Sequence, residues 1–448
     1  MNVQSGTRDI DFRSSLAADS ATAAKYFETA AAALRSLGPP STRSADATRD
    51  AQDIKLRTRA AKERFLRRHV GEIYDTVTAD RSRAMRVCEL LYTVADRFPG
   101  LVPTRQQVEA EQALKRQSAK EGVEIDQGLF ISHVLADPQR GLHLVHAMLK
   151  PKREAMEKLA EFRASGAVAL SEARVERKGK VGHVTLSNPA FLNAEGNRAA
   201  ADLETAVDLA LLDDRIEVCV LRGGVVDHPK HAGRRIFNSG INLTHLYYGQ
   251  IAFADFILER ELGLLHKIYR GHWLADSYSE QFEDYAEKPW LAAVETHAIG
   301  GGCQLLCVMD RVLADHGSYF NLPASKEGFI PGAANLRFPR LVGIQLARQG
   351  IFFERKFMAD TPEGRMICDE TVPREQMDAA IDVNTQQMIR AGFTSAVSNR
   401  KALRVAQEPL SHFRRYMATY ARQQALCFYD PKLIDNLEES WKPSSRHM

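Results

Sequence analysis

Three consecutive glycines, residues 300–302, form the segment of this 448-residue chain whose chemistry is easiest to predict. Because glycine has no Cβ atom, its backbone NH approaches a ligand closely, and at the start of a helix it also lies at the positive end of the helix dipole. The segment therefore predicts an anion site or an oxyanion hole. A close-packed glycine turn without a ligand is the alternative that three glycines alone leave open.

For the glycine NH groups to act in this way, a strand must precede the glycines and a helix must follow them. The flanking residues have the patterns of these two elements. Residues 289–294 form an apolar run whose length suits a buried strand, and residues 305–309 are expected to continue as a buried helix. Upstream, residues 181–186 and 216–221 have strand patterns, and a helical pattern lies between them. Its apolar face contains Leu203, Val207, Ala210 and Leu211. This alternation predicts an α/β fold.

Four blocks of sequence around these elements resemble the crotonase (enoyl-CoA hydratase/isomerase) superfamily. The family turn N-x-P-x-x-x-N-A corresponds to residues 188–194, F-x-A-G-A-D to residues 237–242, and G-G-G-C-E to residues 300–304. The fourth block, P-E-x-x-x-G-x-x-P-G followed by R-L-P-R-x-x-G, corresponds to residues 322–332 and 336–343. The blocks keep the family order, and the resemblance covers roughly residues 172–400.

The resemblance implies a crotonase-like spiral of β-β-α turns that binds acyl-CoA thioesters, with C-terminal oligomerisation helices that assemble a homo-oligomer, a trimer or a hexamer. By motif position, the backbone NH groups of Ile241 and Gly301 would hold the thioester oxygen. Such donors stabilise the charge that appears when the neighbouring carbon loses a proton. Arg235 occupies the place of a family lysine near the CoA phosphates, and a solvated surface charge is the alternative for it.

Two departures from the family pattern carry most of the functional information. Hydratases of this family use one glutamate at the end of G-G-G-C-E and one in the P-E pair, whereas this chain has Gln304 and Ala324 there. Neither side chain acts as an acid or a base near neutral pH. We therefore do not expect water addition by the hydratase mechanism. A catalytically inactive scaffold that only binds CoA esters is one alternative, and a thioester hydrolase or decarboxylase is another.

These departures, together with a long helical N-terminal extension, resemble a branch of the superfamily that oxidises arylacetyl-CoA thioesters with dioxygen. The resemblance implies an α-keto acid and free CoA as products and no metal, flavin or other cofactor, with CoA as part of the substrate and dioxygen as co-substrate. In that chemistry the oxyanion hole stabilises an enolate that reduces dioxygen directly. Gln304 would orient the thioester or the peroxide in a dry pocket, and a core amide that satisfies a backbone group is the alternative.

Four further residues are candidates for substrate binding. Glu195, after the 188–194 turn, and Arg260, at the end of the helical pattern 251–260, are expected to recognise hydroxyl groups on the aryl ring. Each is equally suited to be half of a surface salt bridge. His228 on a loop is a weaker candidate, and Ile330 is expected to form a wall of an apolar space for dioxygen, with simple packing as its alternative.

The region before residue 170 is predicted to be a helical extension, followed by a catalytic core to residue 400 and a C-terminal helical region over residues 401–448. Helices are expected over residues 21–37 and 51–68, and Thr104 with Gln107 predicts a capping box. The extension is expected to pack against the core or a neighbouring subunit, or to cover the acyl pocket.

Composition narrows the class of protein. With 44% hydrophobic and 26% charged residues and a net charge of +3, the chain has an ordinary globular composition and no special affinity for nucleic acid. No run of about 18 apolar residues and no signal-peptide pattern occurs, so we expect a soluble cytoplasmic protein that does not bind membranes. The six cysteines are scattered and predict neither a disulfide framework nor a zinc site.

Overall fold

The computed structural model describes residues 10–274 and 285–441. These residues fall into two units, and every described strand belongs to the second one. Of the described residues, the first unit takes in 10–147, 244–254 and 417–441, and the second takes in 148–243, 255–274 and 285–416. The predicted division at residues 170 and 400 stays a prediction.

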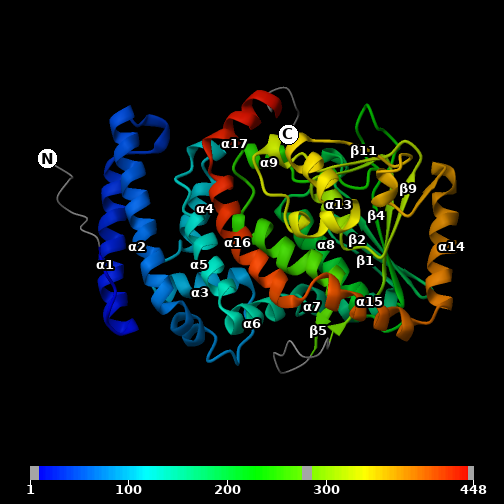
Figure 1. Cartoon of the computed structure of the whole chain (residues 1–448), viewed down its shortest axis with the longest axis horizontal. Coiled ribbons are helices and arrows are strands. Elements are labelled where there is room, and N and C mark those ends of the chain that lie inside the picture. The colour runs from blue at the N-terminus through cyan, green and yellow to red at the C-terminus, as the bar shows by residue number, and fades with distance from the viewer. Residues whose placement is uncertain (1–9, 275–284, 442–448) are drawn as a thin grey trace. The chain divides into compact units, whose positions relative to one another are not determined.

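The first unit is helical (Figure 1). Its long helices α1 and α2 pack along each other through small and aromatic residues spaced three or four apart on α1, Ala23, Phe27 and Ala30. The predicted capping box is confirmed, because Thr104 accepts from the NH of Gln107 at 3.2 Å and Gln107 accepts from the NH of Thr104 at 2.8 Å. The α-helices wholly or partly in this unit are α1 (Leu16–Ser36), α2 (Ala45–Val77), α3 (Val87–Arg97), α4 (Arg105–Gln112), α5 (Ile125–Ala136), α6 (Pro138–Met148), α9 (Leu243–Tyr247), α16 (Leu410–Phe428) and α17 (Pro431–Asn436).

The second unit is built on a seven-stranded sheet in the order β1-β2-β3-β4-β7-β9-β12. The first three strands are antiparallel, and those from β3 onward are parallel. A smaller sheet has the order β11-β10-β8, and β5 pairs with β6. The strands are β1 (Ala167–Ala169), β2 (Ala173–Lys178), β3 (Val181–Leu186), β4 (Val218–Gly223), β5 (His272–Trp273), β6 (Tyr285–Ala286), β7 (Trp290–Val294), β8 (His297–Ile299), β9 (Arg311–Asp315), β10 (Tyr319–Asn321), β11 (Phe357–Met358) and β12 (Glu370–Val372).

Helices follow the strands in the second unit. The α-helices are α7 (Arg153–Ser165), α8 (Asn197–Leu212), α10 (His266–Arg270), α11 (Gly301–Leu306), α12 (Ala324–Glu327), α13 (Ala334–Phe353), α14 (Met377–Arg390) and α15 (Phe393–Gln407). The remaining short elements of the chain are the 3₁₀ turns η2 (Pro40–Thr42), η3 (Gln117–Ala119), η4 (Pro189–Phe191), η7 (Gly364–Met366) and η8 (Arg374–Gln376), and the π-helices η5 (Phe253–Leu258), η6 (Arg260–Leu265) and η9 (Leu437–Trp441).

Both faces of the parallel strands are buried. On β4, Cys219 and Leu221 point to a core that includes Val207 of α8, whereas Val220 points to a second core that includes Met377 of α14. Helices α8 and α14 therefore cover opposite faces of the sheet. This explains why the strand patterns in the sequence are nearly continuous apolar runs rather than clean alternations.

Three predicted elements need correction. The strand expected at 216–221 is β4, Val218–Gly223, and the helix after the glycines ends at Leu306 instead of residue 309. The helix ends early because the chain turns back toward β7 at Asp310. The NH of Asp310 donates to the Trp290 carbonyl, and the Asp310 carboxylate accepts from the NH of Trp290. The helical pattern at 251–260 forms the π-helices η5 and η6, whose wider turn is often found near functional sites. No helix among the described residues is long and apolar enough to cross a membrane.

Candidate active site

Two glycine turns lie against each other at the ends of β8 and of the 237–242 block. The backbones of Asn238 and Ala298 form a parallel bridge, with the NH of Ile299 donating to the Asn238 carbonyl at 3.0 Å. Gly240 has a φ of +80°, and a Cβ atom on it would lie 2.9 Å from the Ile299 oxygen and 3.2 Å from the nitrogen of Gly301. The close approach of the two turns therefore requires glycine at position 240.

Each turn presents one of the two predicted oxyanion donors. Glu195 pairs through its backbone with both neighbours of Ile241, accepting from Asn242 at 2.8 Å and donating to Gly240 at 2.7 Å. The NH of Ile241 therefore points away from Glu195. Gly301 is the first residue of α11, where a helical NH has no acceptor within the helix. Both residues are partly exposed.

Buried asparagines hold the turns in place. The Asn193 side chain accepts from the NH of Asn188 at 2.8 Å and donates to the carbonyls of Gly224 at 2.9 Å and Ile236 at 2.7 Å. Asn238 accepts from the NH of Gly240 and donates to Glu195 Oε1, both at 2.7 Å. The motif asparagines thus fix the backbone from which Ile241 projects its NH.

Arg260 forms the centre of a buried polar cluster beside these turns, which we name the Arg260 cluster and define as Glu195, Arg260, Glu261 and Gln304. Its Nε and Nη2 donate to the two carboxylate oxygens of Glu195 at 2.7 and 2.9 Å, and Nη1 donates to Glu261 at 2.8 Å. Nη2 also donates to the carbonyl of Gly301 at 2.9 Å. The expected alternative of a surface salt bridge for Glu195 and Arg260 is wrong, because their side chains are 0% and 4% exposed.

The guanidinium also sets the orientation of the Gln304 side chain. Arg260 Nη1 lies 2.7 Å from Gln304 Oε1, and because a guanidinium only donates, the amide oxygen must face it. The amide NH2 group of Gln304 therefore points away from Arg260 as a hydrogen-bond donor, and the residue is partly exposed. The alternative of a core amide that satisfies a backbone group does not hold for this oxygen.

Glu261 and Asn238 are two residues of the site that the sequence did not reveal. Glu261 is 2% exposed, and its second carboxylate oxygen accepts from the NH of Ala333 at 3.0 Å. It therefore joins Arg260 to the loop that follows Ile330. With both glutamates ionised the Arg260 cluster carries one net negative charge. A Cβ atom at Gly301 would lie 2.8 Å from Arg260 Nη2, so this glycine is also required by the cluster.

Three predicted substrate-binding residues lie outside this cluster. Arg235 is half-buried and donates to the carbonyl of Gly223 at 3.1 Å, and burial lowers the pKa of its guanidinium. His228 lies on the loop after β4 and accepts from the NH of Lys230 at 3.2 Å. Ile330 is partly exposed on the loop between α12 and α13. The structure brings together Ile241, Gly301, Gln304, Glu195 and Arg260.

A neutral histidine donates a hydrogen bond to the turn of residues 237–242. Ser239 Oγ donates to the Leu192 carbonyl at 2.7 Å, so it must accept from His297 Nε2 at 2.9 Å. Burial, with smaller contributions from the neighbouring His231 and Lys356, lowers the pKa of His297 to about 4. His297 is therefore neutral at physiological pH and acts here as a donor to the turn.

Other titratable groups near the motif blocks have shifted pKa values. Burial raises the pKa of the Cys307 thiol to about 12 and that of Cys303 well above its ordinary value, so neither is a nucleophilic thiolate. Burial, with Glu354 nearby, raises the pKa of Glu327 to about 8. Glu327 ends α12, one turn after the buried Ala324. Within residues 10–274 and 285–441, no three His, Cys, Asp or Glu side chains are grouped to hold a metal ion.

Comparison with known proteins shows the family to which the chain belongs. Residues 176–425 match the model of the enoyl-CoA hydratase/isomerase family, and the chain belongs to this family, that is, to the crotonase superfamily. The fold expected from the sequence is confirmed.

One relative shares nearly the whole length. The chain is 46% identical over 402 residues to the (3,5-dihydroxyphenyl)acetyl-CoA 1,2-dioxygenase of Amycolatopsis orientalis. The alignment covers 90% of this chain and 91% of that protein. It is 27% identical over 217 residues to a short-chain-enoyl-CoA hydratase of Clostridium acetobutylicum, covering 48% of this chain and 74% of that one. The first alignment therefore covers nearly twice as much of this chain as the second.

Among solved structures, an enoyl-CoA hydratase from Mycobacterium avium subsp. paratuberculosis K-10 has a TM-score of 0.50 and 18% sequence identity. The match covers 62% of this chain and 99% of that chain. At this identity the likeness shows the fold alone.

Proposed function

We propose that this protein is a dioxygenase that converts (3,5-dihydroxyphenyl)acetyl-CoA and O2 into 3,5-dihydroxyphenylglyoxylate and free CoA. The observation that carries the proposal is the amide of Gln304, held by Arg260 at the position where a hydratase has its glutamate. The oxyanion donors are kept while the acid that handles water is replaced. The 46% identity to a dioxygenase of this activity, over 90% of the chain, supports the same conclusion.

The first step is loss of a proton from the methylene carbon between the thioester and the ring. The resulting negative charge is shared by the aryl ring and the thioester oxygen, and that oxygen lies between the NH groups of Ile241 and Gly301. Fixed backbone donors of this kind stabilise the enolate without reorganisation, and each contributes roughly 10² to 10³ in rate. The acidity of the arylacetyl methylene lowers the demand on the enzymic base.

The second step uses the enolate as the reductant of dioxygen. One electron passes to O2, and the two radicals combine to form a C–O bond at the α carbon. The terminal peroxide oxygen then attacks the thioester carbonyl, and the C–S bond breaks to release CoA thiolate. Loss of the remaining α proton as the O–O bond breaks gives the keto group and the carboxylate. The overall balance is one thioester and one O2 to one keto acid and one thiol, with both oxygen atoms in the acid.

The Arg260 cluster has two roles in this proposal. Arg260 already donates to Glu195, Glu261, Gln304 and Gly301, so it orients these groups rather than the substrate. Glu195 receives three donors from Arg260 and Asn238, which leaves one carboxylate lone pair. Because its side chain is 0% exposed, contact of this lone pair with a ring hydroxyl requires the pocket to open when the substrate binds. The Gln304 amide NH2 donates to the thioester or to the peroxide, and it cannot protonate the enolate.

The remaining assignments follow from this substrate. Arg235 would contact the CoA phosphates, His228 would contribute to substrate binding, and Ile330 would form the apolar wall beside the dioxygen. The reaction needs no metal or flavin, because the enolate supplies the electrons. We propose a cytoplasmic homo-oligomer, a trimer or a hexamer, that serves antibiotic biosynthesis by supplying the keto acid precursor of dihydroxyphenylglycine in vancomycin-type glycopeptides.

The test is a panel of phenylacetyl-CoA esters with zero, one or two ring hydroxyls, added to chelator-treated protein while oxygen and free thiol are recorded. We expect oxygen uptake with every active ester and the highest kcat/KM for the 3,5-dihydroxy ester. Thiol release without oxygen uptake would indicate a hydrolase or decarboxylase instead. Ester binding without turnover would indicate a scaffold, and either result contradicts the proposal.

A further inference from the structure

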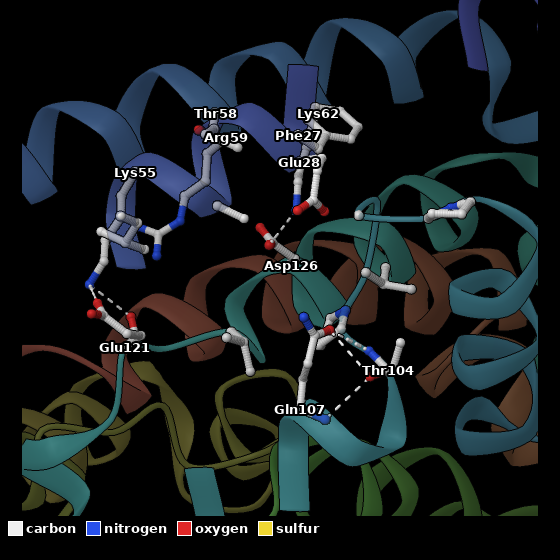
Figure 2. Close-up of a pocket in the computed structure, with 18 of the residues that line it drawn as sticks. Phe27, Glu28, Lys55, Thr58, Arg59, Lys62, Thr104, Gln107, Glu121 and Asp126 are labelled. Atoms are coloured by element: carbon white, nitrogen blue, oxygen red, sulfur yellow. Dashed lines mark hydrogen bonds and ion pairs between the residues drawn. The ribbon is translucent and has the colours of Figure 1, made fainter. Parts of the chain in front are cut away.

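The first unit contains a cavity of about 700 Å³ that the proposed reaction does not use. One wall is the face of α1 that carries Phe27 and Leu34, and another is the face of α2 that carries Ile54 and Arg59 (Figure 2). The residues before α4 and α5 complete the lining. All lining residues precede residue 176, where the match to the family begins. The volume lies in the range of pockets that hold small organic molecules.

The lining is mainly apolar, so the body of a ligand here must be apolar as well. Phe27, Leu34, Ile54, Val102 and Val123 come from four different segments and face the same space. An aryl ring or a medium-length alkyl chain would bury surface against them. A sugar or a nucleotide would leave its hydroxyl groups against these side chains without partners.

The acidic side chains of the cavity are already paired. Glu121 is bonded to Lys55 at 2.5 Å, and Asp126 is bonded to Lys62 at 2.6 Å, as the dashed lines in Figure 2 show. Glu28 pairs with Arg35 at 3.1 Å in an exposed position. These three ion pairs leave no carboxylate to attract a cationic ligand.

Arg59 differs from Lys55 and Lys62, the two other cations of the lining that are not exposed, because those lysines are paired with carboxylates. It is half-buried, and within the described residues no carboxylate or carbonyl is bonded to its guanidinium. Figure 2 shows this side chain directed from α2 into the pocket. A guanidinium presents its NH groups in a planar fork that matches the two oxygens of a carboxylate.

The charge around Arg59 favours an anionic ligand. The lining carries five cationic side chains, Lys25, Arg35, Lys55, Arg59 and Lys62, against three acidic ones, Glu28, Glu121 and Asp126, so its net charge is +2. The planar fork of Arg59 matches a carboxylate. We therefore propose that this cavity binds a small monocarboxylate with an apolar body, and that Arg59 holds its carboxylate. The site is independent of the dioxygenase activity proposed above.

The test is isothermal titration of the full-length protein with two probes, phenylacetate and octanoate, which separate an aryl from an alkyl body. We expect at least one of them to bind with 1:1 stoichiometry. Each probe is compared with its neutral amide, phenylacetamide or octanamide, which fills the same space without the charge. The carboxylate is expected to bind at least tenfold more tightly than its amide.

Three variants assign the binding to this cavity. Arg59→Gln is expected to weaken carboxylate binding at least tenfold and to leave amide binding nearly unchanged, because only the carboxylate uses the guanidinium. Ala31→Phe places a ring in the cavity from α1 and is expected to reduce binding of both. The control Arg57→Gln changes an exposed arginine of the same helix that does not line the cavity, and it should have no effect.

Two results would overturn the proposal. The first is the absence of binding by both carboxylates to wild-type protein. The second is binding that Arg59→Gln and Ala31→Phe leave unchanged while their thermal unfolding matches that of wild type, since the carboxylate would then occupy another site. A dioxygenase activity that fails its own test leaves both results unaffected.

Discussion

The two glycine turns and the Arg260 cluster beside them contribute to the site in different ways. The turns present the backbone NH groups of Ile241 and Gly301, and they keep the glycines of the family pattern. The cluster presents side chains, and at Gln304 it lacks one of the two family glutamates. Relative to the hydratases, the site therefore keeps the backbone donors that stabilise an enolate and lacks the glutamates that add water. Every polar hydrogen of Arg260 is occupied, so the cluster is built to hold groups in place rather than to exchange protons.

The largest effect is expected from a change in the turns. Gly240→Ala places a methyl group 2.9 Å from the Ile299 oxygen and separates the two turns, so kcat should fall by roughly 10² to 10³. Gly233→Ala is the matched control, because Gly233 has a similar φ of +74° and open space around its Cβ position. Steady-state rates of both variants give the comparison. Equal rates for the two would show that the contact between the turns is unimportant.

A change at the centre of the cluster should come next. Arg260→Lys keeps the charge and loses the planar fork, which removes several charge-assisted hydrogen bonds to Glu195 and Gln304. Because one such bond contributes about 1.5 to 3 kcal/mol, we expect a fall in kcat/KM of roughly 10². Arg153→Lys alters an exposed ion pair, with Arg153 92% exposed, and should leave the rate within about twofold of wild type. A fully active Arg260→Lys protein would contradict the role given to the fork.

Gln304→Glu tests the meaning of the neutral amide. The carboxylate would raise the net charge of the Arg260 cluster from −1 to −2 beside the developing enolate, so we expect oxygen uptake to fall by roughly tenfold or more. Gln304→Met removes the donor without adding charge, and its rate of oxygen uptake should fall less than that of Gln304→Glu. An oxygen-electrode rate for each variant decides the point, and an undiminished rate for Gln304→Glu would show that the amide is incidental.

A smaller effect is expected at the outer edge of the cluster. Glu261→Gln replaces one of two acceptors with an NH2 group, so the bond from either Arg260 or Ala333 is lost. We expect kcat to fall a few-fold with KM little changed, because Glu261 positions Arg260 and does not touch the substrate. A change in KM alone would indicate direct contact with the substrate instead.

His297 is expected to affect stability rather than rate. Its pKa is about 4 in the folded chain and about 6.5 when unfolded, so the unfolded state gains protons first as the pH falls. Its contribution to stability is complete above pH 6.5 and is lost progressively toward pH 4. Between pH 7 and pH 5, wild type should lose about 2 kcal/mol of unfolding free energy more than His297→Gln does. Denaturant titrations at the two pH values measure this, and equal losses would contradict it.

The sequence predicts the turns better than the cluster, for a physical reason. The turns depend on glycines and asparagines within short motifs, whose backbone requirements are visible locally. The cluster depends on contacts between residues far apart in the chain, such as Arg260 with Glu195 and with Gln304. Glu261 follows Arg260 directly, yet only the fold shows that both point inward from a π-helix. For the same reason, sequence patterns did not separate a buried ion pair from a surface salt bridge.

The central claim is that dioxygen, and not water, attacks the substrate held by the turns. The most direct measurement is the mass of the acid formed from (3,5-dihydroxyphenyl)acetyl-CoA under ¹⁸O2 in unlabelled water. We expect one acid and one thiol for each O2 consumed, with a label from O2 in the keto group and another in the carboxylate, and no thiol release without oxygen. Unlabelled acid, or thiol release that continues unchanged under anaerobic conditions, would contradict the account.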